Sequence, residues 1–141
     1  MTDNRRDGNK AFAAMPFGAT IGAELTSARP EEVIGSMAWA PERCTGGGIM
    51  HGGALMAFAD TLGGICAFLN LPDGANATST IESKTNFFRA VRSGRVHGTT
   101  RPLHVGRSTI VVQTDIRDDE GRAVALVIQT QAVLAPGNAR Q

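Results

Sequence analysis

One carboxylate stands in an apolar stretch of this chain. Asp60 follows four apolar residues, and Thr61 is the only other polar side chain between His51 and Asn70. An ionised group in such surroundings costs free energy unless it has partners or a chemical task. No Lys or Arg stands three or four residues away, so no local ion pair explains it. We interpret Asp60 as a functional residue; the alternative is a carboxylate that faces solvent on the polar side of a helix.

Two pairs of glycines flank Asp60. Gly52 and Gly53 would place N–H groups without intrahelical partners at the first turn of a helix, where the helix dipole is positive. Such a terminus can hold a developing oxyanion, although a plain capping turn is the alternative. Gly63 and Gly64 each cost about 1 kcal/mol of helix propensity relative to Ala. We therefore expect a sheet, a partner helix or a ligand to approach them closely.

A helix must carry these residues. From His51 to about Asn70 the apolar residues recur every three or four positions, which indicates a helix with one apolar stripe. That stripe comprises Leu55, Phe58, Leu62, Cys66 and Leu69. The glycine-rich loop 45–48 precedes the helix, and the stop signal 71–74 follows it.

The rest of the chain has strand periodicity. Lys10 to Phe17 could form a short helix that Pro16 and Gly18 break. Strands are predicted at 20–27 and 33–40 around a turn at 29–31, and at 78–88, 95–103, 108–117 and 123–134, with a hairpin turn at 118–121. In the last strand one face carries Val124, Leu126, Ile128, Thr130, Ala132 and Leu134, and the other carries Gln129 and Gln131.

This order of elements predicts an α+β fold. A helix of about 20 residues is about 30 Å long, enough to cover one face of the sheet alone. We expect an antiparallel sheet of about six strands wrapped around one long central helix, with one face of each strand on a core.

Length and composition exclude several classes. The 141 residues fit one domain, the net charge of +1 gives no reason to expect nucleic acid, and no apolar run approaches the roughly 18 residues of a membrane span. The polar segment Met1 to Lys10 is interpreted as a frayed leader and not a secretory signal, which predicts a cytoplasmic protein. Cys44 and Cys66 form neither a disulfide framework nor a zinc site.

Arginine is unevenly distributed. Of twelve arginines, five fall in one short stretch: Arg89, Arg92, Arg95, Arg101 and Arg107. Because Arg clamps phosphate oxygens in bidentate fashion, a phosphorylated small ligand is expected. The alternative is a sheet edge protected by charge.

The helix motif resembles a known family. His-Gly-Gly at 51–53, then Asp60, Thr61 and the glycine pair are similar to the active-site helix of hot-dog-fold thioesterases of the phenylacetate-pathway (PaaI-like) type, related to 4-hydroxybenzoyl-CoA thioesterase. Segments 82–90 and 104–108 support the resemblance. It implies a thioesterase domain at 20–135, with a leader and short helix at 1–19 and a tail at 136–141.

The resemblance also implies roles in hydrolysis of acyl-CoA or aryl-CoA thioesters. Asp60 would be the general base or nucleophile, and the Gly52 N–H would polarise the thioester carbonyl. Many relatives carry an Asn in the loop before His-Gly-Gly that helps hold water or the carboxylate, and Thr45 in this loop is expected to substitute for it. Thr80 is near a position that orients water in some relatives, although a plain strand residue is as good an interpretation.

Further residues are expected at the substrate. The residues predicted to bind substrate or coenzyme A are His51, Gly53, Arg89, Arg107 and Phe88. We interpret His51 mainly as structural support for the loop. No cofactor is implied beyond the coenzyme A of the substrate, and His97 and His104 lack metal-ligand spacing.

The spacing of Gly52 and Asp60 bears on assembly. Eight residues of helix rise about 12 Å, too far for both to touch one thioester. The site is therefore expected to combine Gly52 of one subunit with Asp60 of another, in a homodimer or a homotetramer of two dimers.

Two alternatives stay open at this level. A dehydratase or hydratase of the same fold would need a histidine in a distinctive loop, and loop 40–50 contains none. A non-catalytic acyl-CoA-binding domain would have less use for a bare carboxylate at Asp60.

Overall fold

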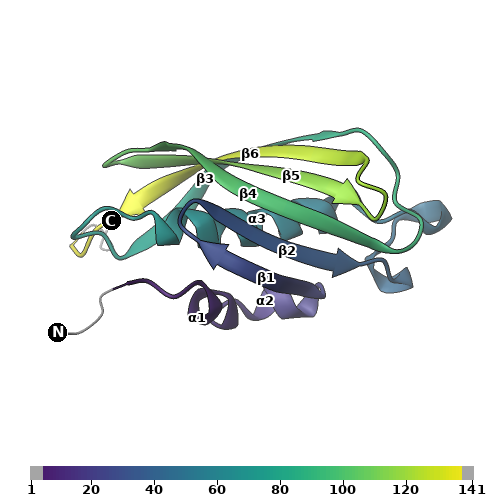
Figure 1. Ribbon diagram of the computed structural model, residues 1–141, viewed down its shortest axis with the longest axis horizontal. Coiled ribbons are helices and arrows are strands. Elements are labelled where there is room, and N and C mark those ends of the chain that lie inside the picture. The colour runs from purple at the N-terminus through teal and green to yellow at the C-terminus, as the bar shows by residue number, and fades with distance from the viewer. Residues whose placement is uncertain (1–4, 138–141) are drawn as a thin grey trace.

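A six-stranded antiparallel sheet curls around one long helix in the computed structural model, which describes residues 5–137 (Figure 1). The helices are α1 (Gly8–Ala13), α2 (Pro16–Thr20) and α3 (Gly52–Leu69), and the strands are β1 (Ala23–Arg29), β2 (Glu32–Ala38), β3 (Ala77–Phe87), β4 (Arg95–Val105), β5 (Thr109–Asp118) and β6 (Ala123–Leu134). This is the predicted hot-dog architecture. The bounds of α3 and of the last four strands agree with the sequence prediction to within two residues.

The strands lie in the order β1-β2-β4-β5-β6-β3, so β1 and β3 are the two edges. Strand β3 pairs with β6 alone, and the register shifts between Thr80 and Glu82, at a bulge. The strand that follows α3 in the sequence therefore lies at one edge of the sheet, and its outer backbone groups pair with no other strand among residues 5–137.

Helix α3 fits closely against the sheet because glycines face it. Gly35 of β2 and Gly98 of β4 are paired neighbours. A Cβ at Gly98 would lie 2.6 Å from Leu62 and 2.9 Å from Phe58, both of which are buried on α3. The glycine pair thus leaves the space that these two large side chains occupy.

Strand β6 does not face the core as simple alternation suggests. An apolar face normally packs inward and a polar face outward. In the structure Gln129 and Gln131 are each 1% exposed and face α3, whereas Ile128 of the other face is 37% exposed. The polar face of β6 is therefore part of the core.

The N-terminal segment is more ordered than predicted. Two helices replace the single expected one, because Pro16 begins α2 and does not end a helix there. Arg6 donates hydrogen bonds to the carbonyls of Leu71 (2.9 Å) and Ala75 (3.1 Å), so the expectation of a frayed leader is wrong from residue 5 onward. Residues 1–4 lie outside the described residues.

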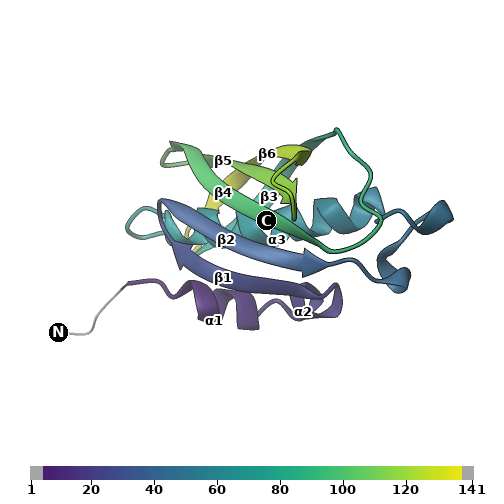
Figure 2. The same ribbon diagram turned by 45° about the vertical axis from the view of Figure 1, so that its right-hand side comes forward.

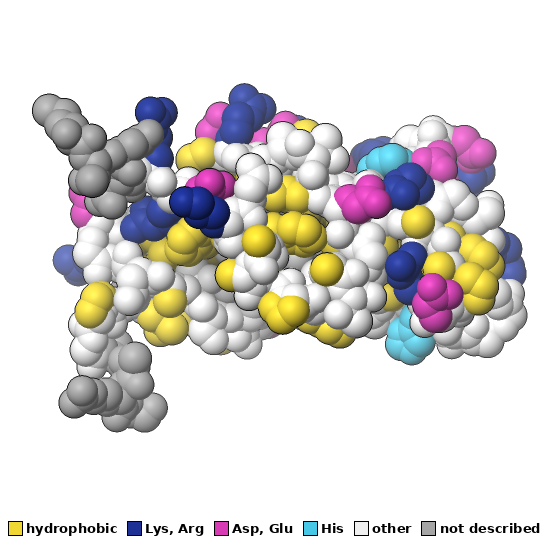
Figure 3. Space-filling model, turned by 90° about the horizontal axis from the view of Figure 1, so that it is seen from below, with side chains coloured by type: hydrophobic (Ala, Val, Ile, Leu, Met, Phe, Trp, Pro, Cys, Tyr) yellow, Lys and Arg dark blue, Asp and Glu magenta, His cyan; other side chains and the backbone are white. Residues whose placement is uncertain are grey.

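Helices α1 and α2 lie along the β1 side of the molecule (Figure 2). Gly8 of α1 packs against Ile65 and Leu69 of α3, so this layer covers part of the central helix. Seen from below, hydrophobic side chains gather across the middle of this face (Figure 3). Phe17 of α2 is 61% exposed.

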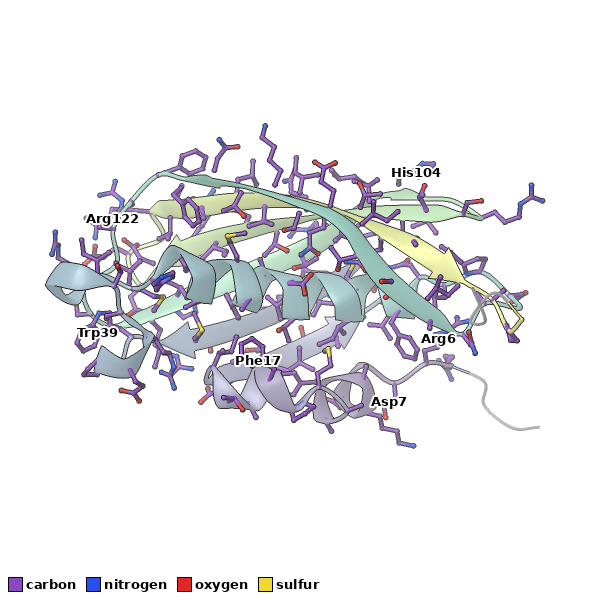
Figure 4. All side chains as sticks on the ribbon, turned by 180° about the vertical axis from the view of Figure 1, so that it is seen from behind. Arg6, Asp7, Phe17, Trp39, His104 and Arg122 are labelled. Carbon is purple, nitrogen blue, oxygen red and sulfur yellow. The ribbon has the colours of Figure 1, made fainter. Side chains whose placement is uncertain are left out.

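One strip of α3 stays uncovered. Seen from behind, the helix lies at the front of the molecule, and β3 crosses near its C-terminal end (Figure 4). Gly53, Met56 and Asp60 are exposed along this strip, and Gly64 and Phe68 are partly exposed. The strip is apolar except for Asp60.

Helix α3 is long and apolar enough to cross a membrane by length and composition alone, with 18 residues and a mean hydropathy of 1.5. The expectation that no apolar run approaches this length is therefore wrong. More than half of the helix is buried inside the fold, as the core helix of a soluble domain would be.

Candidate active site

The Asp60 side chain is exposed on the open strip of α3, and it is held by donors from the sheet. Thr80 Oγ1 of β3 donates a 2.9 Å hydrogen bond to Oδ1 of Asp60, and Gln129 Nε2 of β6 donates a 3.0 Å bond to the same oxygen. Within the single chain the carboxylate thus faces solvent, as the alternative interpretation had it, and its position is fixed by partners far away in the sequence.

A second layer supports these donors. Gln131 Nε2 donates to Thr80 Oγ1 at 2.7 Å. Since a hydroxyl that accepts a hydrogen bond keeps its single proton for another acceptor, this bond directs the Thr80 proton toward Asp60. The sequence predicted Thr80 as a site residue but did not predict Gln129 or Gln131. The only sign of these two residues in the sequence was a pair of amides in a mostly apolar strand.

The other expected polarising group lies at the start of α3. Gly52 is the first helical residue, and its N–H has no acceptor among residues 5–137. The Gly53 N–H, in contrast, donates to His51 Nδ1 at 2.7 Å, so the prediction that both N–H groups are bare is wrong for Gly53. His51 acts as the helix cap, which agrees with a structural interpretation of that residue.

A cavity of about 360 Å³ opens beside Gly52. Its lining includes four residues that the sequence singled out: Thr45, Gly52, Phe88 and Arg89. We call these four the helix-terminus half-site, and Asp60, Thr80 and Gln129 the carboxylate half-site. The structure brings the members of each half-site together, but in one chain it places the two half-sites at different points along α3.

A larger cavity, of about 560 Å³, opens near the carboxylate half-site. Gly64, one helical turn beyond Asp60, and Thr78, two residues before Thr80, belong to its wall. Apolar side chains of α1 and α3, among them Ala11 and Phe68, form much of the remaining lining, with Arg5 and Lys10 also present.

The five clustered arginines divide into two groups. Arg92 donates to the Gly47 carbonyl, Arg95 pairs with Glu24 and Arg101 pairs with Glu32. Arg89 and Arg107 are exposed, and no ion pair or hydrogen bond joins either side chain to another of the described residues. These two are the arginines predicted to hold phosphates.

Neither cysteine belongs to a half-site, although Cys44 directly precedes Thr45. Cys66 is fully buried in the core, and burial raises the pKa of its thiol to about 12, so it stays protonated and unreactive near neutral pH. Cys44 Sγ approaches the Ala40 carbonyl at 3.3 Å. Among residues 5–137 no three His, Cys, Asp or Glu side chains gather as metal ligands would.

Comparison with known proteins identifies the fold and its chemistry. The sequence profile of the Thioesterase superfamily matches residues 47–125, which include the whole of α3 and of strands β3, β4 and β5. The chain belongs to this thioesterase family. The match covers Asp60, Gly52 and Thr80, and it leaves α1, α2, β1, β2 and most of β6 outside.

Three individual proteins to which the chain is similar are consistent with membership of this family. A protein of Vibrio cholerae is 41% identical over 86 residues, which are 61% of this chain and 57% of that protein, so the match spans little more than half of that relative. The 1,4-dihydroxy-2-naphthoyl-CoA hydrolase of Escherichia coli is 34% identical over 87 residues, covering 62% of this chain and 63% of the hydrolase. The structure of a mutant thioesterase PA1618 from Pseudomonas aeruginosa superposes with a TM-score of 0.85 at 26% identity, over 94% of this chain and 97% of that one.

The two half-sites hold chemically complementary groups. A carboxylate can act as a general base or nucleophile, and a free N–H at the positive end of a helix dipole can stabilise an oxyanion. Hydrolysis of a thioester needs both at one carbonyl.

Proposed function

We propose that this thioesterase hydrolyses acyl-CoA or aryl-CoA thioesters in a site shared by two subunits. The observation that carries the proposal is Asp60: a carboxylate on an otherwise apolar, uncovered strip of α3, held by donors from two strands. An uncovered apolar strip favours coverage by a partner, and a fixed carboxylate favours catalysis over solvation.

The distance along α3 requires the second subunit. Gly52 and Asp60 are separated by about 12 Å of helix rise, whereas a thioester carbonyl and an attacking water span only about 3 Å. Thr80 binds Asp60, and the Phe87 ring lies against Gly52 within the same chain. Thr80 and Phe87, which lie next to Asp60 and Gly52 respectively, both belong to β3, one of the two edge strands of the sheet.

Antiparallel pairing of β3 with its copy would align the half-sites. If Thr80 of one chain lies opposite Phe87 of its partner, Asp60 of the first chain comes next to Gly52 of the second. Because the bulge between Thr80 and Glu82 adds one residue to β3, the two-fold axis of that pairing passes at Lys84. The same pairing gives β3 a partner for its unpaired backbone groups and covers the strip that contains Met56.

The arginines fit the same arrangement. Arg107 follows β4 near the start of β3, and Arg89 lies just beyond its end, so the two are separated by about 35 Å of strand in one chain. Antiparallel β3 strands would bring Arg107 of one subunit to the end that carries Arg89 of the other. Both could then bind phosphates of one coenzyme A.

The reaction itself needs only water as co-reactant. Oδ2 of Asp60 takes a proton from water while the water oxygen bonds to the thioester carbon, and the Gly52 N–H stabilises the oxygen anion. The carbon–sulfur bond then breaks, and the coenzyme A thiolate leaves and takes up a proton. Direct attack by Asp60 would instead give an anhydride that water opens. The apolar 560 Å³ cavity beside Gly64 is the proposed place for the acyl group.

The Asp60→Asn variant tests the proposal. We expect it to fold and to bind substrate while kcat falls by 10³-fold or more, on the order seen when a catalytic base is lost. The measurement is release of free thiol over a panel of acyl-CoA and aryl-CoA substrates, which also reports the preferred acyl group.

Asp115→Asn is the matched control, since it makes the same change on β5, away from α3. Wild-type turnover in the Asp60 variant would contradict the assignment. Binding without turnover in the wild-type protein would favour a non-catalytic acyl-CoA-binding domain.

A further inference from the structure

Gln129 is the most strongly buried polar side chain in contact with Asp60. It comes from the middle of β6, is 1% exposed, and lies among apolar residues such as Val112 and Val127. A buried amide costs free energy unless its hydrogen bonds are made, and an apolar side chain of the same length would fill the position without that cost. A further role is needed to explain the amide.

The helix is shaped to admit this amide. A Cβ at Gly63 would overlap Oε1 of Gln129 and would lie 2.9 Å from its Cδ. Gly63 therefore forms a notch in α3, three residues beyond Asp60, in which the end of the Gln129 side chain rests. Gly63 lowers the helix propensity of α3. The glycine in α3 and the buried amide in β6 thus both serve the contact between Gln129 and Asp60.

The hydrogen bonds fix which way the amide points. An ionised carboxylate only accepts, so Gln129 must present its NH₂ group to Asp60. Its Oε1 then faces Gly63 and lies 3.4 Å from Gln131 Nε2. Gln131 in turn donates to Thr80, and Thr80 donates to Asp60.

Both donors bind the same carboxylate oxygen. Gln129 and Thr80 approach Oδ1 at 3.0 and 2.9 Å, and no hydrogen bond reaches Oδ2 from the described residues. Two donors from different strands prevent rotation of the carboxylate plane. Oδ2 is thereby left as the oxygen that faces outward with a free lone pair.

We propose that Gln129, seated in the notch at Gly63, is a positioning residue that holds Oδ1 of Asp60 so that Oδ2 is the reacting oxygen, with Gln131 acting through Thr80. This role rests on the proposed thioesterase function, which makes Asp60 the catalytic carboxylate. Gln129 touches no reacting atom; it sets the orientation of the group that does.

The Gln129→Met variant tests the role, because Met fills a similar volume and has no amide. We expect kcat to fall on the order of 10- to 100-fold, as for misplacement of a catalytic group, while KM changes by less than about threefold. Gly63→Ala should give the same pattern, since its Cβ displaces the Gln129 amide. Gln113→Met makes the same chemical change on β5 outside the network and should keep wild-type kinetics.

Gln129→Glu adds a readout that a purely structural role would not give. The new carboxyl can donate to Oδ1 only while it is protonated, so the activity of this variant should fall as pH rises through its titration. The Gln129→Met variant should lack that additional fall, because it carries no titrating group at this position.

Asp60→Asn is measured in the same assay. If Asp60→Asn is inactive while Gln129→Met and Gly63→Ala keep kcat within about twofold of wild type, the positioning role is overturned and the proposed function stands. An equal loss of kcat in Gln113→Met would also overturn it. An inactive wild-type protein, or an active Asp60→Asn variant, would overturn the proposed function and this role with it.

Discussion

Charged side chains in this protein differ in whether the chain itself supplies their partners. Asp119 accepts hydrogen bonds from the His97 ring at 2.7 Å and from the Arg95 N–H at 3.0 Å, and so ties the β5–β6 turn to the start of β4. Arg89 and Arg107 have no such partners among the described residues. At the residue scale, partnered charges serve the fold, and unpartnered ones are the candidates for ligand binding.

Asp119 predicts a pH dependence of stability. The hydrogen bond with His97, and then that from the Arg95 backbone, lower the pKa of Asp119 below its ordinary value of 3.8. Because the folded-state pKa is the lower one, its stabilisation is complete above the ordinary value and is lost as pH falls through the folded-state value. The difference in urea midpoint between wild type and Asp119→Asn should therefore be full near pH 6 and shrink as pH falls below about 4.

Urea unfolding at several pH values measures this difference directly. Asp73→Asn, in an exposed loop, is the control and should show little change at any pH. A difference for Asp119→Asn that stays constant down to pH 2 would contradict the account of this turn.

At the scale of elements, α3 and the sheet fit because small and large residues face each other. Gly35 and Gly98 stand opposite Phe58 and Leu62, and together they set how closely the helix approaches β2 and β4. Overpacking such a contact costs about 1 to 3 kcal/mol.

Gly98→Ala is therefore expected to lower the free energy of unfolding by about 1 to 3 kcal/mol. The new Cβ would fall 2.6 Å from Leu62, in a core where neither large side chain has room to move. Gly46→Ala is the control, since open space surrounds a Cβ there. Thermal or urea unfolding measures both variants, and equal stability of the two would contradict this packing.

The sequence was sufficient to predict most elements, the fold class and the thioesterase family. Helical and strand periodicities are local signals, so α3 and the last four strands could be placed to within two residues. The contact of Gln129 with Asp60 spans 69 positions, and no local spacing reveals it. The inward face of β6 was also unpredictable, because an amide needed beside a carboxylate has the same polarity as one that faces water.

The exposed position of Asp60 has a related cause. Helix α3 is apolar on nearly all sides, which normally indicates burial on all sides. In one chain the sheet, α1 and α2 cover only part of it, and the strip with Met56 and Asp60 stays open. Sequence alone could not say which strip that would be, since the periodicity has no clear polar side.

At the scale of the whole molecule, the proposed dimer accounts for three features. These are the open strip of α3, the free edge of β3 and the separation of the two half-sites. A single chain holds a carboxylate without an oxyanion donor within reach, and a helix N-terminus without a base. The proposed isologous dimer through β3 would form two complete sites from four incomplete ones. The central claim is that each site takes Asp60 from one subunit and the Gly52 N–H from the other.

Complementation between two inactive variants tests this claim most directly. Asp60→Asn removes the base, and Gly52→Pro removes the N–H at a first helical position that tolerates proline. Each variant alone should be inactive. In a heterodimer, Asp60 of the Gly52→Pro chain meets Gly52 of the Asp60→Asn chain, so co-expressed or mixed and refolded chains should regain about a quarter of wild-type kcat per subunit. A mixture with verified heterodimers and no more activity than its parents would contradict the shared site.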